Sequence, residues 1–426
     1  MNIPKDLNEL IQADLITAET AAKITAYYQN KSGASQNRLF IVFGILGALL
    51  VGLGIILIIA HNWDELSTQA KTIFAFLPLL LGQLLCGYTL LKNPDSIALR
   101  ESSAAFLFCS IGASIALVSQ IYNIPGDTAA FVLCWMLLGL PLVYLMKSSV
   151  VSLLYIVGIT NYATVTGLSS YAPTVSDMYW LLILGVLPHY YGLYRSKPYG
   201  NFTLFHHWAI PVSLSIALGT VVKNNTILVV AYISLFALFY MIAKSGTFAG
   251  QKTINNGYKI LGLLGTLGIL LVLSFDGFWK ELRSENWQFS VVIISPEFLA
   301  AVVTTLLAAA MLYQHKKNRT LSDIKPFAVV FVPFIIIFLI GLVSDIAVVL
   351  INLIVFTIGM LTIRDGAKRD HLGILNFGLL IITILVICRF FDSDLSFVIR
   401  GLLFVGVGIG FFITNYMMIK KRKRNA

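Results

Sequence analysis

A succession of long apolar runs dominates this chain of 426 residues. Each run holds about 20 residues with almost no charge, which is the length that an α-helix needs to cross the hydrocarbon core of a bilayer. Inside a bilayer every backbone polar group must be paired within the protein, so such runs form helices. Fourteen runs are visible in the sequence: 39–60, 72–91, 102–121, 128–146, 149–168, 178–194, 204–222, 226–243, 260–275, 298–313, 326–343, 346–363, 372–389 and 397–419. We therefore predict an all-α fold, a polytopic integral membrane helix bundle of about 14 transmembrane helices.

The composition excludes most other classes of protein. Hydrophobic residues make up 58% of the chain and charged residues 12%, against roughly 45–50% and 25% in soluble proteins. This balance rules out a soluble globular protein, a disordered chain and a secreted disulfide scaffold. The four cysteines all lie within apolar runs and have no metal-ligand spacing, so we predict no metal site and no cofactor. They are Cys86, Cys109, Cys134 and Cys388.

The net charge of +10 is explained by the membrane, because the basic residues cluster at the ends of the apolar runs. If the N-terminus is cytoplasmic and the runs alternate in direction, 24 of the 30 Lys and Arg residues lie inside and 6 outside. Cytoplasmic loops carry such an excess of basic residues. We therefore predict both termini inside, the lipid bilayer as the main partner, and no nucleic-acid partner.

Three segments follow from this topology. Residues 1–38 are predicted to form a short cytoplasmic helical hairpin, with Thr17 as the N-cap between its helices. Residues 39–419 form the transmembrane bundle, and residues 420–426 form a basic cytoplasmic tail. The hairpin is too small to bury a core alone, so it is a candidate binding element for a protein partner.

The first polar group worth weighing is the sequence His61-Asn62-Trp63-Asp64-Glu65, at the outer end of the first run. Capping explains much of it, because Asn62 can cap a helix that starts at Trp63 and Glu65 can complete a capping box. Capping does not explain His61, which lies within one turn of Asp64 and Glu65. Those carboxylates would favour a protonated imidazole, so a proton or cation site remains the alternative.

At this motif the sequence resembles a known family. The segments that carry the resemblance are Leu39–Lys71 with Gly44, Gly47, Gly52 and Gly54, then Ser119-Gln120-Ile121-Tyr122 with Gly126-Asp127 and Trp135, and finally Arg389-Phe390-Phe391-Asp392 with Arg400-Gly401. In these segments and in the preceding hairpin, the chain is similar to the bacterial membrane family called domain of unknown function 2157. The resemblance implies a multi-pass protein of the bacterial inner (cytoplasmic) membrane, and it implies no established activity.

Two more polar groups lie on the predicted outer side. Gln120, Tyr122 and Asp127 flank a turn between the third and fourth runs. One explanation is that they stabilise the turn, and the other is that they line the entrance of a binding site.

Arg389, Asp392, Asp394 and Arg400 join the last two runs. Charges at membrane depth are usually paired, so a structural clamp competes with an anion-binding pair of arginines. We expect the three outer groups to converge as one candidate polar site.

Other polar residues within the runs have no motif of their own. His189 follows Pro188 and is compatible with a broken helix, whereas His206 and His207 lie near the inner interface. No pattern of nucleophilic catalysis, metal hydrolysis or phosphate binding is present, so an enzyme is the weaker expectation.

The architecture favours a transporter or flippase-like protein that moves a small or lipid-linked substrate. The alternatives are a membrane-embedded enzyme acting on a lipid-linked substrate at the outer face, and a non-catalytic membrane sensor or scaffold. A groove that joins the three outer groups would favour the enzyme.

Overall fold

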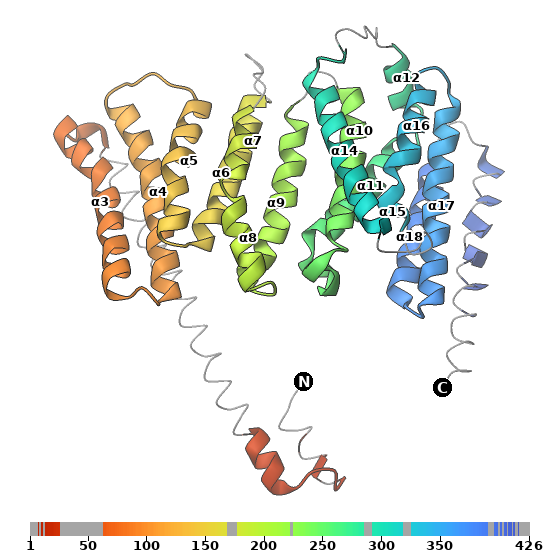
Figure 1. Ribbon diagram of the computed structural model, residues 1–426, viewed down its shortest axis with the longest axis horizontal. Coiled ribbons are helices and arrows are strands. Elements are labelled where there is room, and N and C mark those ends of the chain that lie inside the picture. The colour runs from red at the N-terminus through yellow and green to blue at the C-terminus, as the bar shows by residue number, and fades with distance from the viewer. Residues whose placement is uncertain are drawn as a thin grey trace. The chain divides into compact units, whose positions relative to one another are not determined.

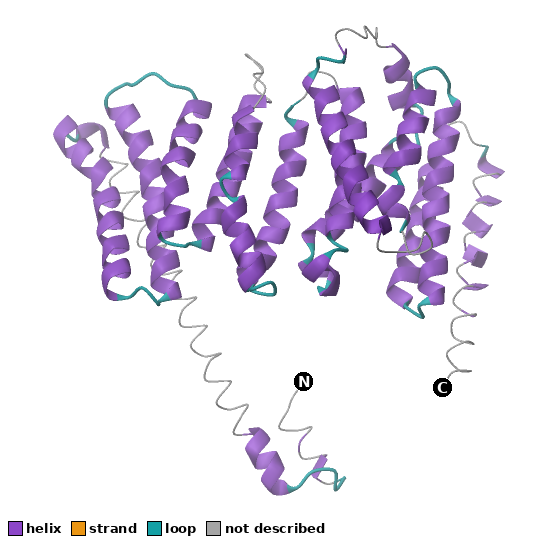
Figure 2. Cartoon of the chain, viewed as in Figure 1, coloured by secondary structure: helices purple, strands orange, loops and turns teal. Residues whose placement is uncertain are grey.

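The protein is described by a computed structural model that covers residues 7, 10–11, 13–25, 63–167, 177–221, 225–284, 292–317, 325–390, 396–398 and short pieces between 401 and 416. The chain divides into two compact units, Met1–Ala75 and Phe76–Ala426. Every regular element within the described ranges is helical, and none of them is a strand (Figure 2). The predicted all-α fold is therefore confirmed for the part of the chain that the structure covers.

The first unit contains the N-terminal residues and the start of the first long described helix. A helical stretch covers residues 18–25, and the Thr17 hydroxyl accepts a hydrogen bond from the Thr20 N–H at 3.3 Å, as expected for an N-cap. Most of the predicted hairpin, the whole run 39–60 and the tail 420–426 lie outside the described residues.

Among the described residues, eight helices are long and apolar enough to cross a membrane. Each of them overlaps one of the predicted runs, and together they make a multi-pass membrane protein. They are α3 (Thr68–Lys92), α4 (Ile97–Ile121), α5 (Thr128–Leu145), α6 (Ser149–Gly167), α9 (Asn201–Gly219), α14 (Pro296–Lys317), α17 (Ile346–Lys368) and α18 (Leu372–Phe390) (Figure 1).

The remaining described elements are shorter or bent. They are η1 (Trp63–Glu65), α7 (Asp177–Leu184), α8 (Leu187–Ser196), α10 (Asn225–Ile242), η2 (Gly246–Gly250), η3 (Thr253–Asn255), α11 (Gly257–Val272), α12 (Gly277–Ser284), α15 (Pro326–Val329) and α16 (Phe331–Gly341). If α11 and α12 are counted as one span, they form a ninth candidate span that is bent by 74°.

Two predicted runs are each divided between two helices, and at Pro188 the sequence was already compatible with a broken helix. The run 178–194 is divided between α7 and α8, and the run 326–343 between α15 and α16. Pro188 and Pro333 lie just after the two breaks, and proline has no N–H to bond the preceding turn. Proline suits the first turn of a new helix, and Pro188 is the second residue of α8.

Two large hydrophobic clusters form most of the core of the second unit, and α10 belongs to both; a third, small cluster joins α17 and α18. Leu235 and Phe239 of α10 pack in the cluster built around α4 to α9, while Ala237 and Met241 pack with α11 to α18. Many large apolar side chains elsewhere remain exposed, such as Leu84 and Val349 at 71% and 65%. Exposed apolar surface on this scale is typical of helices that face lipid.

Candidate functional site

The His61 group is only partly described, since His61 and Asn62 lie outside the described residues. Trp63, Asp64 and Glu65 form a single 3-10 turn, η1 (Trp63–Glu65), in which both carboxylates are exposed. The Lys71 ammonium lies 5.7 Å from the centre of the Trp63 ring, a cation–π contact. The two explanations of this group, a helix cap at Asn62 and a proton site at His61, therefore both remain proposals.

The turn between α4 and α5 holds the second predicted group. Asp127 precedes α5, and its carboxylate accepts a hydrogen bond of 2.6 Å from the Ala130 N–H, so it is an N-cap. Tyr122 ends α4 and exposes half of its side chain, and Gln120 is exposed in the last turn of that helix. Asn123 takes a positive φ of 47°, which asparagine tolerates in turns. Turn and cap chemistry thus accounts for Asp127.

A cavity of about 860 Å³ lies between α3, α4 and α5 next to this turn. Its described lining is mostly apolar, and Gln83, Ser119 and Asp127 are among the polar residues that border it. Asp127 therefore both caps a helix and borders a space large enough for an apolar molecule.

Replacing Asp127 by alanine is expected to lower the free energy of unfolding by about 0.5–2 kcal/mol, the usual cost of losing a helix cap. Asp127→Asn, whose amide oxygen still accepts the Ala130 N–H, should retain most of that stability. Thermal unfolding of the two purified variants measures the difference. Equal unfolding temperatures for Asp127→Ala and the wild type would contradict the capping role.

The third predicted group is described at one residue. Arg389 lies in the last turn of α18, and its guanidinium stacks over the Phe275 ring at 4.5 Å. Its Nη2 donates to the Ser274 hydroxyl at 3.3 Å. Arg389 thus contacts the corner between α11 and α12, and its predicted partners Asp392, Asp394 and Arg400 lie outside the described residues.

The structure does not bring the second and third groups together. The α4–α5 turn belongs to helices of the first hydrophobic cluster, and α18 belongs to the second. Within the second unit, α4 and α5 lie at the opposite end of the row of helices from α18 (Figure 1). The expected convergence on one outer site is therefore not seen for the described members.

A buried acid that the sequence analysis did not single out organises a different place. Glu101 of α4 is only 8% exposed. Its carboxylate accepts hydrogen bonds of 3.0 Å from the N–H groups of Ser149 and Val150, and a further hydrogen bond from the Ser148 hydroxyl. These are the first N–H groups of α6, so Glu101 caps a neighbouring helix at its positive end.

Histidine side chains continue this polar contact into the core. His189 Nε2 lies 3.4 Å from the Ser149 hydroxyl, and its ring centre is 5.9 Å from that of His206. His206 is fully buried, with Nε2 at 2.9 Å from the Ser152 hydroxyl and Nδ1 at 2.7 Å from the Phe202 carbonyl oxygen. A carbonyl oxygen only accepts, so Nδ1 carries the proton and Nε2 is the acceptor for Ser152.

Tyr190 extends the contacts to the next histidine. Its ring stacks on His206, and its hydroxyl lies 2.8 Å from Nδ1 of the buried His207. His207 Nε2 lies 3.1 Å from the amide nitrogen of Gln251, which also donates to the Pro198 carbonyl. An amide nitrogen only donates, so Nε2 of His207 accepts and its Nδ1 donates to Tyr190.

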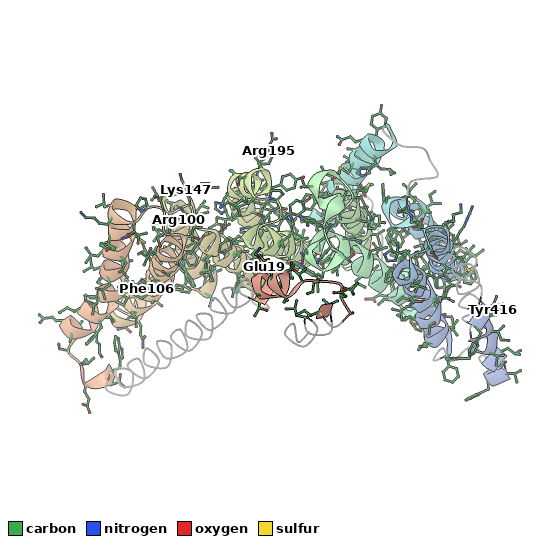
Figure 3. All side chains as sticks on the ribbon, turned by 90° about the horizontal axis from the view of Figure 1, so that it is seen from below. Glu19, Arg100, Phe106, Lys147, Arg195 and Tyr416 are labelled. Carbon is green, nitrogen blue, oxygen red and sulfur yellow. The ribbon has the colours of Figure 1, made fainter. Side chains whose placement is uncertain are left out.

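We call this set the Glu101–histidine network. It comprises Glu101, Ser149, Ser152, His189, Tyr190, His206 and His207. It joins α4, α6, α8 and α9 near one end of these helices. Arg100 of α4 and Arg195 of α8 lie at the same end. Figure 3 looks at the molecule from that end and labels Arg100, Lys147 and Arg195.

The network is suited to exchanging protons and has no arrangement for a metal. Histidine is the side chain whose ordinary pKa lies near physiological pH, and the rings of His206 and His207 each have a hydrogen-bond donor on one nitrogen and an acceptor on the other. Within the described ranges, no group of three or more His, Cys, Asp or Glu residues is placed to hold a metal ion.

Sequence reasoning missed the network because its partners are far apart in the chain. Glu101 bonds to residues 47 to 49 positions later, and Ser152 bonds to His206 54 positions later. The available signals were an acid immediately before an apolar run and three histidines between 189 and 207. Neither has the local spacing that marks a motif.

These features define the class of protein: a multi-pass membrane protein whose described elements are all helical, with a buried polar network between its helices. Residues 8–152 match the family model described as "Predicted membrane protein (DUF2157)", which confirms the resemblance found in the sequence. Glu101, Asp127 and the start of α6 lie within the matched segment, and the three histidines lie beyond it. No curated protein and no solved structure gives a significant match.

Proposed function

We propose that this protein is a secondary transporter or flippase-like protein that moves a small or lipid-linked substrate, and that it takes up and releases protons at the Glu101–histidine network. The observation that carries the proposal is the clustering of three histidines between apolar helices, two of them fully buried, each hydrogen-bonded to a hydroxyl and linked to the next by ring contacts. Ionisable groups within membrane helices are costly, and they commonly mark ion pathways and proton relays.

Capping alone does not account for the network. It explains Glu101, because a carboxylate at the start of a helix stabilises it. His189, His206 and His207 bond to side chains of other helices and to a carbonyl, and none of them caps a helix start. An apolar residue at each position would avoid the cost of burying these polar groups, so their presence favours a functional role.

The outer-face enzyme has less support. It requires the polar groups of the outer side to share one groove, and within the second unit the α4–α5 turn and Arg389 lie at opposite ends of the row of helices. The N-terminal hairpin remains a proposed binding element for a protein partner, and the sensor or scaffold role depends on it.

We further propose fourteen spans with both termini in the cytoplasm, in the inner membrane of a bacterium. The alternation of the turns supports this topology. The turns from α3 to α4, α5 to α6, α8 to α9 and α17 to α18 lie at one end of the helices, and the α4–α5 and α16–α17 turns lie at the other (Figure 1). Lys147 and Arg369 are at turns of the first end, as the positive-inside rule requires of the cytoplasmic side.

Reporter fusions test the topology. A reporter placed after Lys325 or after Lys420 is expected to report the cytoplasm, and one inserted next to Ser284 is expected to report the outer side, because 24 of 30 basic residues then lie inside. Paired alkaline phosphatase and fluorescent protein fusions give opposite signals on the two sides. A cytoplasmic signal at Ser284 would contradict the fourteen-span topology.

Charge displacement after a pH jump tests proton uptake without knowledge of the substrate. The purified full chain is reconstituted in liposomes on a solid-supported membrane, and the pH is lowered from about 8 to about 4, well past the ordinary pKa of histidine, because burial disfavours a charged imidazole. The wild type is expected to give a transient current larger than that of protein-free liposomes. The double variant His206→Gln, His207→Gln should lose most of this current.

His315→Gln is the matched control, because His315 bonds only to a carbonyl of its own helix in the described contacts and lies outside the network. It should give the wild-type current. A wild-type current no larger than that of empty liposomes would overturn the proposal. The same conclusion follows if the double variant, reconstituted at equal density, gives an unchanged current.

A further inference from the structure

A second cavity lies in the other half of the unit, away from the Glu101–histidine network. It has a volume of about 510 Å³ and is formed by the ends of α10, α11, α15, α17 and α18 with η3. Charged side chains line one part of it: Lys244, Lys259, Lys325, Asp365 and Arg369. Apolar side chains line the other part, including Leu263, Leu264, Phe327, Leu361 and Phe377.

Positive charge exceeds negative charge in this lining. Asp365 is the one carboxylate among the described lining residues, and it is shared by Lys325 Nζ at 2.6 Å and Arg369 Nε at 2.9 Å. Four cations against one carboxylate leave three positive charges around one cavity. Like charges this close repel one another unless an anion is bound between them.

Lys244 and Lys259 are the cations with no carboxylate contact within the lining. Lys259 Nζ donates to the Thr253 hydroxyl at 2.6 Å, and Lys244 Nζ lies 5.8 Å from the centre of the Tyr240 ring. Burial and the neighbouring Lys259, Arg369 and Lys325 lower the pKa of the Lys244 ammonium. An anion beside Lys244 would reverse that effect, because an opposite charge favours the protonated form.

The apolar part of the cavity distinguishes it from a simple anion site. Phe327 is buried in the core, while Leu264 and Leu361 are exposed, so the apolar wall continues from the interior to the exposed surface of the helices. A molecule that fills both parts must carry an anionic group at one end and a hydrocarbon chain at the other.

We infer that this cavity binds an anionic amphiphile, with a phosphate group between Lys244, Lys259 and Arg369 and an acyl or isoprenoid chain along the apolar wall. Basic pockets between membrane helices on the cytoplasmic side bind anionic lipid headgroups, and the proposed topology puts this cavity on that side. The inference does not depend on proton uptake, since none of its residues belongs to the Glu101–histidine network.

Native mass spectrometry of the full chain, released from detergent, tests the inference with three probes: dioleoyl-phosphatidylglycerol, dioleoyl-phosphatidylcholine and inorganic phosphate. Phosphatidylglycerol is expected to bind at least about tenfold more tightly than phosphatidylcholine. The double variant Lys244→Ala, Lys259→Ala should lose about that tenfold preference, and Phe377→Ala should weaken phosphatidylglycerol without affecting inorganic phosphate.

The charge-matched control is Lys92→Ala, Lys147→Ala, which removes two exposed lysines outside the cavity. It should keep the wild-type preference for phosphatidylglycerol.

Removing Lys244 and Lys259 relieves the repulsion between like charges, so the lipid-free double variant should unfold at the same temperature as the wild type or higher. Equal binding of the two lipids, or an unchanged preference in the Lys244, Lys259 variant, would overturn the inference. If inorganic phosphate binds as tightly as phosphatidylglycerol and Phe377→Ala has no effect, the ligand is a soluble phosphate and the amphiphile is excluded.

Discussion

Replacing Glu101 by alanine is expected to lower the free energy of unfolding by about 3 kcal/mol, because it removes a buried acceptor that serves three donors. The N–H groups of Ser149 and Val150 and the hydroxyl of Ser148 would lose their partner. An unpaired buried polar group typically costs about 1–3 kcal/mol, and partial hydration at the helix end limits the sum.

Glu101→Gln separates the hydrogen bonds from the charge. A glutamine has one acceptor oxygen in place of two, so it should recover part of the stability and none of the interaction between a carboxylate and the positive end of α6. Thermal unfolding of the purified variants, followed by intrinsic fluorescence, gives the order wild type, Glu101→Gln, Glu101→Ala. Glu281→Ala, which removes an exposed acid from α12, is the control. An unfolding temperature of Glu101→Ala equal to that of the control would contradict the capping role.

Local sequence patterns predicted the helices well, because helix hydrogen bonds and apolar runs are local. The run predicted at 128–146 is α5 at Thr128–Leu145, and the run at 372–389 is α18 at Leu372–Phe390. Proline alone did not locate the two broken runs, because other prolines lie inside continuous helices, as Pro141 does in α5 and Pro211 in α9. Helix α12 was missed because its sequence is short and polar, and its identity as a bent continuation of α11 depends on tertiary packing.

The candidate sites were predicted only where their chemistry is local. The Asp127 cap bonds to a residue three positions later, and turn chemistry anticipated it. Arg389 contacts Ser274, which lies 115 positions earlier, and no spacing rule connects them. The same holds for Lys325 and Asp365, which are 40 positions apart. Positive-inside counting explained such basic residues as topology, and only the folded arrangement shows them around one cavity.

Trp279 of α12 is expected to be a residue on which the stability of the bent span depends. Its side chain is fully buried, and its indole N–H donates to the Leu273 carbonyl at 2.8 Å, across the bend between α11 and α12. The ring also lies against Gly341 of α16, where an added Cβ would be only 2.1 Å from it. One side chain therefore holds α12 both to the end of α11 and to α16.

Replacing Trp279 by alanine is expected to lower the free energy of unfolding by about 3–5 kcal/mol, the usual cost of emptying the space of a buried tryptophan. Trp180→Ala is the matched control, because Trp180 is 37% exposed and leaves a smaller cavity.

Gly341→Val disrupts the same contact from α16, because the valine side chain would overlap the Trp279 ring. Overpacking of this kind typically costs about 1–3 kcal/mol. In the double variant Gly341→Val, Trp279→Ala the valine enters the space left by the ring, so the loss should be smaller than the sum of the two single losses. Thermal unfolding of the four variants measures these differences, and strictly additive losses would show that Trp279 and Gly341 do not pack against each other.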